Sequence, residues 1–301
     1  MLGRFDIGLP TLSPARLLAT VGLIQGLLAG CQAPAVRTYE HTAAGHGFSG
    51  LEVAGDPFDH RVYLNRAASA PIASRLHVYI DGDGIAWHDH GRPALEPTAR
   101  NPLVLRLMAL DPGPAIYLGR PCYLGVYDPA ICAPWYWTHG RYGKPVVDSM
   151  VRALTRILED HAVRDLTLIG YSGGGTLAML MAARLAEVSS VVTLAANLDV
   201  QAWTDHHGYS PLSGSLDPAR QPPLPAHIRQ WHWVGGDDLE VPPGVLEKGL
   251  AHQPGAHAQV IPGVDHACCW EDRWPLLLKA VTREGQATRQ DSPGRVTHGG
   301  L

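Results

Sequence analysis

The chain has 301 residues, of which 46% are hydrophobic, and its formal net charge is −4 at pH 7. This length and apolar content predict one large globular domain. The composition has no basic excess, which argues against a nucleic-acid partner. The 16 histidines are scattered along the chain, and a scattered histidine is by default a surface or core residue rather than a metal ligand.

The N-terminus has the pattern of an export signal. Arg4 and Arg16 precede an apolar run over residues 17–29, which has the length of a signal-peptide hydrophobic region and is too short for a membrane anchor. The run ends in Leu28-Ala29-Gly30-Cys31, which resembles a bacterial lipobox. The alternative is a plain secretory peptide that is cut after a small residue.

The lipobox resemblance has consequences for processing and location. It implies that residues 1–30 are a lipoprotein signal peptide, that Cys31 carries lipid and that the protein is anchored in a bacterial cell envelope. Gln32, rather than an aspartate, favours the outer membrane, facing the periplasm or the exterior. Contact with the membrane is therefore expected through the N-terminal lipid anchor.

Export would place the other cysteines in an oxidising compartment. Cys122 and Cys132 flank a loop rich in proline and tyrosine, and a disulfide easily closes such a spacing. Cys268 and Cys269 are adjacent and lie close to His266. A zinc site of these three residues fails on spacing, because adjacent cysteines rarely direct both sulfurs at one tetrahedral ion. Two free, buried thiols are expected instead.

Strands alternate with helices along the chain. Residues 33–45 are interpreted as a tether within a 31–48 linker, and residues 50–66 as an antiparallel strand pair. Further strands are expected at residues 76–80, 115–118, 165–169, 191–194, 231–234 and 258–261. Helices are expected at residues 101–110, 145–161, 176–185, 245–252 and 274–282. This alternation predicts an α/β fold with a mostly parallel central sheet covered by helices on both faces.

The predicted domain organisation is simple. Residues 49–284 are expected to form the α/β domain, in which the Pro-, Ser- and His-rich residues 199–229 make a small lid insertion. The polar residues 285–301 are interpreted as a disordered tail. Ligands of parallel sheets bind at the carboxyl ends of the strands, so the functional residues are expected in the loops at that edge.

A glycine-rich corner follows the strand at residues 165–169. Gly170-Tyr171-Ser172-Gly173-Gly174 joins this strand to a helix, and glycines tolerate the tight turn that would hold the Ser172 hydroxyl clear of the backbone. The pattern predicts a nucleophile elbow. The alternative is a phosphate-binding loop at a helix N-terminus, but the lysine of a P-loop and a GxGxxG pattern are missing.

A serine hydroxyl becomes a nucleophile when a histidine takes its proton and a carboxylate supports that histidine. Asp237 and Asp238 occupy the turn after the strand at residues 231–234, and His266 follows the last strand. A packed core residue is the alternative role for His266. A turn aspartate that caps the local backbone is the alternative role for one of the two acids.

With these residues the sequence resembles the α/β-hydrolase superfamily over residues 50–282. It is similar to bacterial lipoprotein members that carry an acidic Gly-Asp-Gly turn, here Asp81-Gly82-Asp83-Gly84. The order serine, acid, histidine is the one that this superfamily uses. The superfamily acid typically stands three residues before a Val-Pro pair, which favours Asp238 over Asp237.

The resemblance also implies an oxyanion hole. The backbone N–H of Gly173 supplies one donor, and the turn after the strand at residues 76–80 supplies the other, from Asp83 or, as the second choice, Gly84. Related lipases have a histidine where this chain has Asp81, so the turn departs from their pattern. If Asp83 donates its N–H, its carboxylate is expected to point away, to a cation, a cap or solvent.

No metal and no cofactor are expected. Asp81 and Asp83 lack the further oxygen ligands of a calcium loop, and His88-Asp89-His90 offers fewer ligands than a catalytic zinc needs. Aromatic residues are expected to line the pocket, namely Trp87, Tyr171, Trp203 and Trp270.

The sequence therefore predicts an exported serine hydrolase. It would cleave an ester, as a carboxylesterase or a lipase does, through an acyl-enzyme on Ser172 and a Ser-His-Asp triad. The expected substrate is a small-molecule or lipid-like ester. Two alternatives stay open: a non-catalytic envelope lipoprotein that uses the same scaffold for binding, and a peptidase or depolymerase with the same triad.

Overall fold

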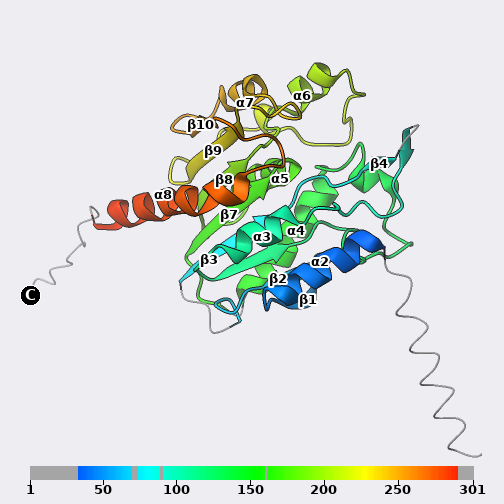
Figure 1. Ribbon diagram of the computed structural model, residues 1–301, viewed down its shortest axis with the longest axis horizontal. Coiled ribbons are helices and arrows are strands. Elements are labelled where there is room, and N and C mark those ends of the chain that lie inside the picture. The colour runs from blue at the N-terminus through cyan, green and yellow to red at the C-terminus, as the bar shows by residue number, and fades with distance from the viewer. Residues whose placement is uncertain (1–32, 70–73, 89–90, 160, 291–301) are drawn as a thin grey trace, which may run out of the picture.

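The computed structural model describes residues 33–69, 74–88, 91–159 and 161–290 (Figure 1). The predicted signal peptide, Cys31 and residues 291–301 of the predicted tail lie outside these residues. None of the helices within the described residues is long and apolar enough to cross a membrane.

Eight strands form one sheet in the order β1-β2-β6-β3-β7-β8-β9-β10. The strands from β6 to β10 in this order run parallel, whereas β1 pairs antiparallel with β2 and β2 with β6. Their bounds are β1 Ser49–Ala54, β2 Asp59–Leu64, β3 Arg75–Ile80, β6 Ala115–Leu118, β7 Asp165–Tyr171, β8 Val188–Leu194, β9 Arg229–Gly235 and β10 His257–Ile261. A separate antiparallel pair, not predicted, consists of β4 Trp87–His88 and β5 Arg92–Pro93. The mostly parallel sheet predicted from the sequence is confirmed.

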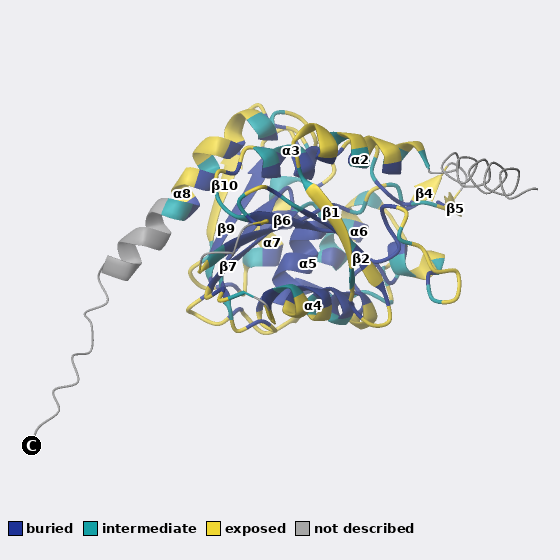
Figure 2. Ribbon diagram, turned by 90° about the horizontal axis from the view of Figure 1, so that it is seen from below, coloured by how far each residue is buried: buried dark blue, intermediate teal, exposed yellow. Residues whose placement is uncertain are grey.

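Helices cover both faces of the sheet. The helices are α2 Pro34–Gly45, α3 Leu103–Ala109, α4 Lys144–Glu159, α5 Gly173–Ala182, α6 Val200–His207, α7 Pro243–Leu250 and α8 Trp270–Gln290, with 3-10 turns η2 Pro134–Trp137 and η3 Pro218–Arg220. Figure 2 shows α4 below the sheet and α2 and α3 above it. The predicted α/β class with two covered faces is therefore confirmed.

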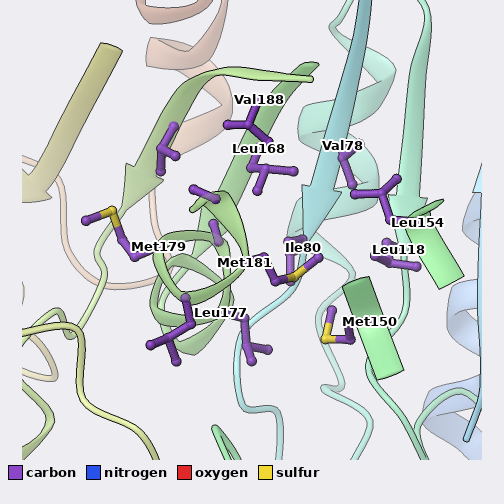
Figure 3. Packing of buried hydrophobic residues seen from close by; sticks show 14 of the residues in the cluster. Val78, Ile80, Leu118, Met150, Leu154, Leu168, Leu177, Met179, Met181 and Val188 are labelled. Atoms are coloured by element: carbon purple, nitrogen blue, oxygen red, sulfur yellow. The ribbon is translucent and has the colours of Figure 1, made fainter. Parts of the chain in front are cut away.

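The core is divided by the sheet, because successive side chains of a strand point to opposite faces. On one face, Val78 and Ile80 of β3 pack with Met150 of α4 and Leu177 of α5 (Figure 3). On the other face, Tyr79 of β3 packs in a second buried cluster that includes residues of α2, α3 and α8. A sheet buried on both faces explains why its strands are near-continuous apolar runs.

The segment predicted to be a tether is helix α2, so that prediction is wrong. Pro34 stands in the first turn of α2, where a missing N–H costs nothing. Val36, Tyr39 and Ala43 recur at helical spacing and are buried against the domain. The position after an apolar signal had suggested a linker, whereas the periodicity of the segment is that of an amphipathic helix.

The C-terminal region also differs from the prediction. Helix α8 begins at Trp270 and continues to Gln290, so residues 285–290 are helical and not part of a disordered tail. Acidic Glu271 and Asp272 lie in its first turn, where negative charge complements the helix dipole. Within the predicted lid, residues 199–229, the chain forms α6 and η3 joined by irregular loops.

Candidate active site

Ser172 lies at the corner between β7 and α5. Its backbone has φ 51° and ψ −127°, a conformation that costs energy for any residue with a side chain and that is typical of functional corners. Gly174 lets the corner pack tightly, because a Cβ added there would lie 2.2 Å from the carbonyl oxygen of Ile80. The strained strand-to-helix corner predicted from the glycine pattern is present.

Three side chains from separate loops meet at this corner. His266, which follows β10, has Nε2 3.2 Å from the Oγ of Ser172. Its Nδ1 lies 2.9 Å from Oδ2 and 3.1 Å from Oδ1 of Asp238, which follows β9. A carboxylate accepts hydrogen bonds, so Nδ1 carries the proton and Nε2 presents its lone pair to the serine hydroxyl. The arrangement is that of a nucleophile, a base and an orienting acid.

The structure distinguishes the two candidate acids. The side chain of Asp238 is 0% exposed, and its Oδ1 also accepts the backbone N–H groups of Glu240 and Val241 at 2.9 and 2.8 Å. These bonds fix the carboxylate opposite His266. Asp237 is exposed, and among the described residues His266 bonds to Asp238 and not to Asp237. The carboxylate beside the histidine is therefore that of Asp238.

The loop that carries His266 is held by two aromatic donors. The hydroxyl of Tyr171 and the Nε1–H of Trp270 donate to the His266 carbonyl oxygen at 2.8 and 3.0 Å. Burial raises the pKa of Tyr171 well above its ordinary value, so its hydroxyl keeps the donated proton. Trp270 is fully buried beneath the loop and does not line the cleft, contrary to the prediction.

The described part of the chain contains two disulfides. Cys122 is bonded to Cys132 with Cα atoms 5.7 Å apart, as predicted. Cys268 and Cys269 are bonded to each other, so the prediction of free thiols is wrong. They are not buried either: Cys268 is exposed and Cys269 is half-buried. Sequence spacing alone does not distinguish an adjacent pair of thiols from a bonded pair, because both fit the same dipeptide.

The turn after β3 faces the serine. A Cβ added to Gly82 would lie 3.2 Å from the Cβ of Ser172, and one added to Gly173 would lie 2.1 Å from Oδ1 of Asp83. Gly173 is the first residue of α5, so its N–H has no intrahelical partner. Gly84 has φ +63° and packs against Pro97. Gly173, Asp83 and Gly84 thus lie around the corner, and their service as oxyanion donors stays a prediction.

The carboxylate of Asp83 bonds to two cations, as expected, but it lies against Gly173 rather than pointing away from the corner. Oδ1 accepts from Arg120 Nη1 at 2.5 Å, and Oδ2 accepts from Arg141 Nη1 at 2.8 Å and from the Tyr142 hydroxyl at 2.5 Å. Burial alone would raise the pKa of Asp83, but the charges of Arg141 and Arg120 lower it far below its ordinary value. Sequence reasoning missed all three partners, although Arg120 follows β6 at the functional edge of the sheet.

Asp81 has a different environment from Asp83. It accepts the hydroxyls of Tyr39 and Tyr117 at 2.5 and 3.2 Å and the N–H of Gly82 at 2.8 Å. Burial raises the pKa of Asp81, and these hydrogen bonds only partly oppose the rise. Asp81 therefore ties the turn to helix α2 and strand β6.

A cleft of about 960 Å³ opens over Ser172 and His266. Of the aromatic residues predicted to line it, Trp87, Tyr171 and Trp203 do so. The predicted lid contributes Trp203, Tyr209, Ser210 and Leu212 to its wall. His88 is an exposed lining residue, and Asp89 and His90 lie outside the described residues. Within the described part of the chain, no group of three or more His, Cys, Asp or Glu side chains could hold a metal ion.

No model of a known protein family matches the sequence, and no curated protein does so either. Solved structures do match the fold. A membrane phospholipase A, described as a bacterial virulence factor, superimposes with a TM-score of 0.55 at 16% identity, over 91% of this chain and 99% of its own. Est1E from Butyrivibrio proteoclasticus gives 0.54 at 14% identity, over 79% and 99% of the two chains.

A third structure of the same fold is a peptidase. The proline iminopeptidase of Mycobacterium smegmatis superimposes with a TM-score of 0.53 at 13% identity, over 80% of this chain and 98% of its own. At such identities the likeness concerns the fold and not the reaction. The eight-stranded sheet, its helical layers and these superpositions together show that the chain has the α/β-hydrolase fold.

Proposed function

We propose that the protein is a serine hydrolase that cleaves carboxylic esters through a covalent acyl-enzyme on Ser172. The observation that carries this proposal is the continuous chain of hydrogen bonds from Ser172 through His266 to Asp238 at the floor of an open cleft. A scaffold used only for binding has no need of a strained serine, a histidine on its hydroxyl and a buried carboxylate behind that histidine.

The geometry supports the following acylation step. His266 Nε2 takes the hydroxyl proton of Ser172 while Oγ attacks the ester carbonyl carbon, and Asp238 supports the imidazolium that forms. The carbonyl oxygen of the substrate becomes negatively charged and accepts hydrogen bonds from the N–H groups of Gly173 and of the Asp83 turn. The intermediate then collapses: the bond to the alcohol oxygen breaks, and the alcohol leaves with the proton from Nε2.

Deacylation repeats these steps with water. His266 removes a proton from a water molecule, whose oxygen attacks the acyl carbon, and a second oxyanion forms in the same position. Collapse of this intermediate breaks the bond to Oγ, and Ser172 recovers its proton from Nε2. The carboxylic acid leaves, and no cofactor enters either half of the reaction.

The cleft favours a lipid-like or other bulky ester as substrate. Its volume of about 960 Å³ lies at the upper end for small-molecule sites, which are usually lined by apolar and aromatic side chains. Trp87, Trp203 and Leu212 provide such a lining. One structure of the same fold is a membrane phospholipase A. A peptidase shares the fold as well, so peptides are the second substrate class to be tested.

The test uses a fluorophosphonate probe, which reacts with activated serines, and p-nitrophenyl esters of increasing chain length. The wild type is expected to be labelled at Ser172 and to hydrolyse the esters, and Ser172→Ala is expected to lose both activities. Ser210→Ala is the matched control, because Ser210 lines the same cleft, whereas the serine hydroxyl that His266 Nε2 meets is that of Ser172. Labelling of Ser172→Ala at another residue would contradict the assignment.

The choice between ester and amide is made with paired substrates. An ester hydrolase is expected to turn over p-nitrophenyl acyl esters far faster than the p-nitroanilides of amino acids, which a peptidase would prefer. A folded wild type that is inert to the probe and to both substrate sets would instead support the non-catalytic binding protein.

Export and lipid attachment belong to the same proposal and rest on the sequence Leu28-Ala29-Gly30-Cys31. Expression of the full chain in a Gram-negative host with a labelled fatty acid is expected to give a labelled protein in the outer-membrane fraction. Cys31→Ser is expected to lose the label. A wild type that is cleaved and released without lipid would identify a plain secretory peptide.

A further inference from the structure

A buried group of charges lies directly behind the turn that faces Ser172. We call Asp83, Arg120, Arg141 and Tyr142 the Asp83 cluster. The side chains of the two arginines are 1% and 6% exposed, and both donate to the one carboxylate. Within these four residues, one negative and two positive charges leave a surplus of one positive charge. Asp81, whose pKa burial raises, is the neighbouring acid on which the charge of Arg120 also acts. Burying an uncompensated positive charge costs free energy unless a negatively charged group lies close to it.

The surplus lies next to the proposed oxyanion site. A Cβ added to Gly173 would lie 2.1 Å from Oδ1 of Asp83 and 2.5 Å from the hydroxyl of Tyr142. The cluster therefore contacts the residue whose N–H is proposed to bind the oxyanion. An isolated carboxylate at this place would repel the negative charge that develops on the substrate. Two arginines on that carboxylate reverse the sign of the local charge.

The cluster is held rigidly by further hydrogen bonds. Arg141 Nε donates to the carbonyl oxygen of Thr138 at 2.7 Å, and Arg120 Nη2 donates to that of Arg141 at 3.1 Å. Asn197 Nδ2 donates to the hydroxyl of Tyr142 at 3.3 Å. Charges fixed in this way need no reorganisation when the substrate becomes charged, which is the condition for strong electrostatic stabilisation.

The backbone of Asp83 is fixed as well. Its carbonyl oxygen accepts the hydroxyl of Tyr123 at 2.9 Å, while its side chain is held by the arginines. The bonds to its carbonyl oxygen and to its side chain together restrict where the N–H of Asp83 can point. Because the two arginines hold the pKa of Asp83 far below its ordinary value, the carboxylate stays charged through the pH range of an esterase assay.

We infer that Asp83 and Arg141 are positioning residues for hydrolysis at Ser172. Asp83 fixes the turn that presents an N–H to the oxyanion, and Arg141 supplies the surplus positive charge that favours the anionic intermediate. This inference rests on the proposed function. Arg141 lines the cleft. Its Nε and Nη1 are bonded to Thr138 and Asp83, so we assign it a role through the cluster rather than a direct bond to substrate.

The test compares substitutions at Arg141 in the full chain. Arg141→Met leaves a neutral Asp83–Arg120 pair, and its kcat for a neutral p-nitrophenyl ester is expected to fall about 100-fold, as when one element of oxyanion stabilisation is lost. Arg141→Lys keeps the charge but not the planar guanidinium. Its kcat is expected to be about tenfold higher than that of Arg141→Met and still below that of the wild type. The KM is expected to stay within about threefold, because the neutral ester in its ground state does not use the surplus charge.

A milder pair of variants keeps the test valid if Arg141→Met does not fold. Tyr142→Phe removes one donor to Asp83 and is expected to lower kcat about fivefold, the value of one ordinary hydrogen bond. Tyr79→Phe is the matched control: its hydroxyl donates at 2.7 Å to another buried carboxylate, Asp111, outside the cleft. This control is expected to reduce thermal stability without lowering kcat.

Three outcomes would overturn the inference or its basis. A folded Arg141→Met with an unchanged kcat would overturn it alone. A rise in KM confined to esters that carry a carboxylate, with kcat for neutral esters intact, would assign Arg141 to substrate binding instead. A wild type that reacts with neither ester nor fluorophosphonate would contradict the proposed function itself, and the inference with it.

Discussion

Among the residues that the structure describes, two histidine–aspartate pairs have similar hydrogen bonds and different surroundings. His266 Nδ1 lies 2.9 Å from Asp238 Oδ2, and His77 Nδ1 lies 2.6 Å from Asp111 Oδ2. The His266 side chain is 22% exposed, and its second nitrogen meets the Ser172 hydroxyl in the cleft. The His77 side chain is 5% exposed, and neither member of its pair lines the cleft.

The difference lies in what else each carboxylate holds. Asp111 also accepts the Tyr79 hydroxyl at 2.7 Å and the Gly113 N–H at 2.9 Å, so it ties β3 to the chain after α3. Asp238 accepts its other hydrogen bonds from the backbone N–H groups of Glu240 and Val241 in its own turn. A histidine–aspartate pair is thus a structural unit by default. Solvent access and a nucleophile on the second nitrogen make it suitable for catalysis.

The largest expected effect separates the two pairs by activity. Asp238→Asn is expected to lower kcat about 10³- to 10⁴-fold, because an amide no longer supports the correct histidine tautomer or the imidazolium. Steady-state hydrolysis of a p-nitrophenyl ester measures the effect. Asp237→Asn alters the exposed neighbour and serves as the control, with activity close to wild type. An equal loss in both variants would contradict the assignment of Asp238.

A third histidine, His60, is buried without a carboxylate partner, and it predicts how stability depends on pH. His60 is bonded to the Gly119 carbonyl and the Ser149 hydroxyl, and burial lowers its pKa from 6.5 to about 4. The unfolded chain therefore binds a proton that the folded protein does not, and stability is lost as pH falls from 6.5 towards 4. This histidine accounts for about 3 kcal/mol of that loss, at 1.36 kcal/mol per pKa unit.

Urea unfolding at several pH values measures this linkage. The wild type is expected to lose stability over that interval, and His60→Asn is expected to show a smaller slope. His232, whose pKa burial lowers to about 3, contributes in the same direction and is the reason that some slope remains. Identical slopes for the wild type and His60→Asn would show that His60 does not stay neutral in the fold.

The buried pair is expected to affect stability alone. Asp111→Asn places an amide N–H₂ where the carboxylate accepts from His77, Tyr79 and Gly113. The unmatched donors are expected to cost about 1–3 kcal/mol of unfolding free energy. Denaturant unfolding gives this value, while kcat of the folded variant is expected to match wild type. A large loss of kcat would mean that the two pairs are coupled.

The smallest expected effect concerns the support of the His266 loop. Tyr171→Phe removes one of two donors to the His266 carbonyl oxygen and leaves Trp270 in place. The kcat is expected to fall about fivefold, the value of one hydrogen bond. Trp270→Phe and the double variant complete a cycle, and the double loss is expected to exceed the sum of the single losses. Strict additivity would show that the two donors act independently.

The sequence predicted well those features of the fold that depend on residues close together in the chain. Alternating apolar and helical stretches gave the parallel sheet, and the glycines around Ser172 gave the corner. Asp238 and His266 were proposed because each follows a strand in the expected chain order, and the structure brings the two side chains into contact. Helix α2 was missed although Val36, Tyr39 and Ala43 carry a helical period, since its position suggested a linker.

The Asp83 cluster was harder to predict, because its members approach from distant loops. Arg141 and Tyr142 lie between η2 and α4, in a stretch without regular periodicity. Only the tertiary fold brings them to Asp83, which is 58 and 59 positions away in sequence. The bond between Cys268 and Cys269 was missed for a different reason: the two residues are adjacent, but no spacing rule distinguishes a bonded pair from two free thiols.

The hydrogen bond from Tyr39 to Asp81 has a practical consequence for recombinant work on this protein. A version trimmed to begin at the first strand, Ser49, would lack helix α2. Asp81, in the turn that faces Ser172, would then lose its shortest hydrogen bond, the one from Tyr39. Such a trimmed protein could fold around an intact sheet and still be a poor enzyme. Expression boundaries should therefore retain helix α2, Pro34–Gly45.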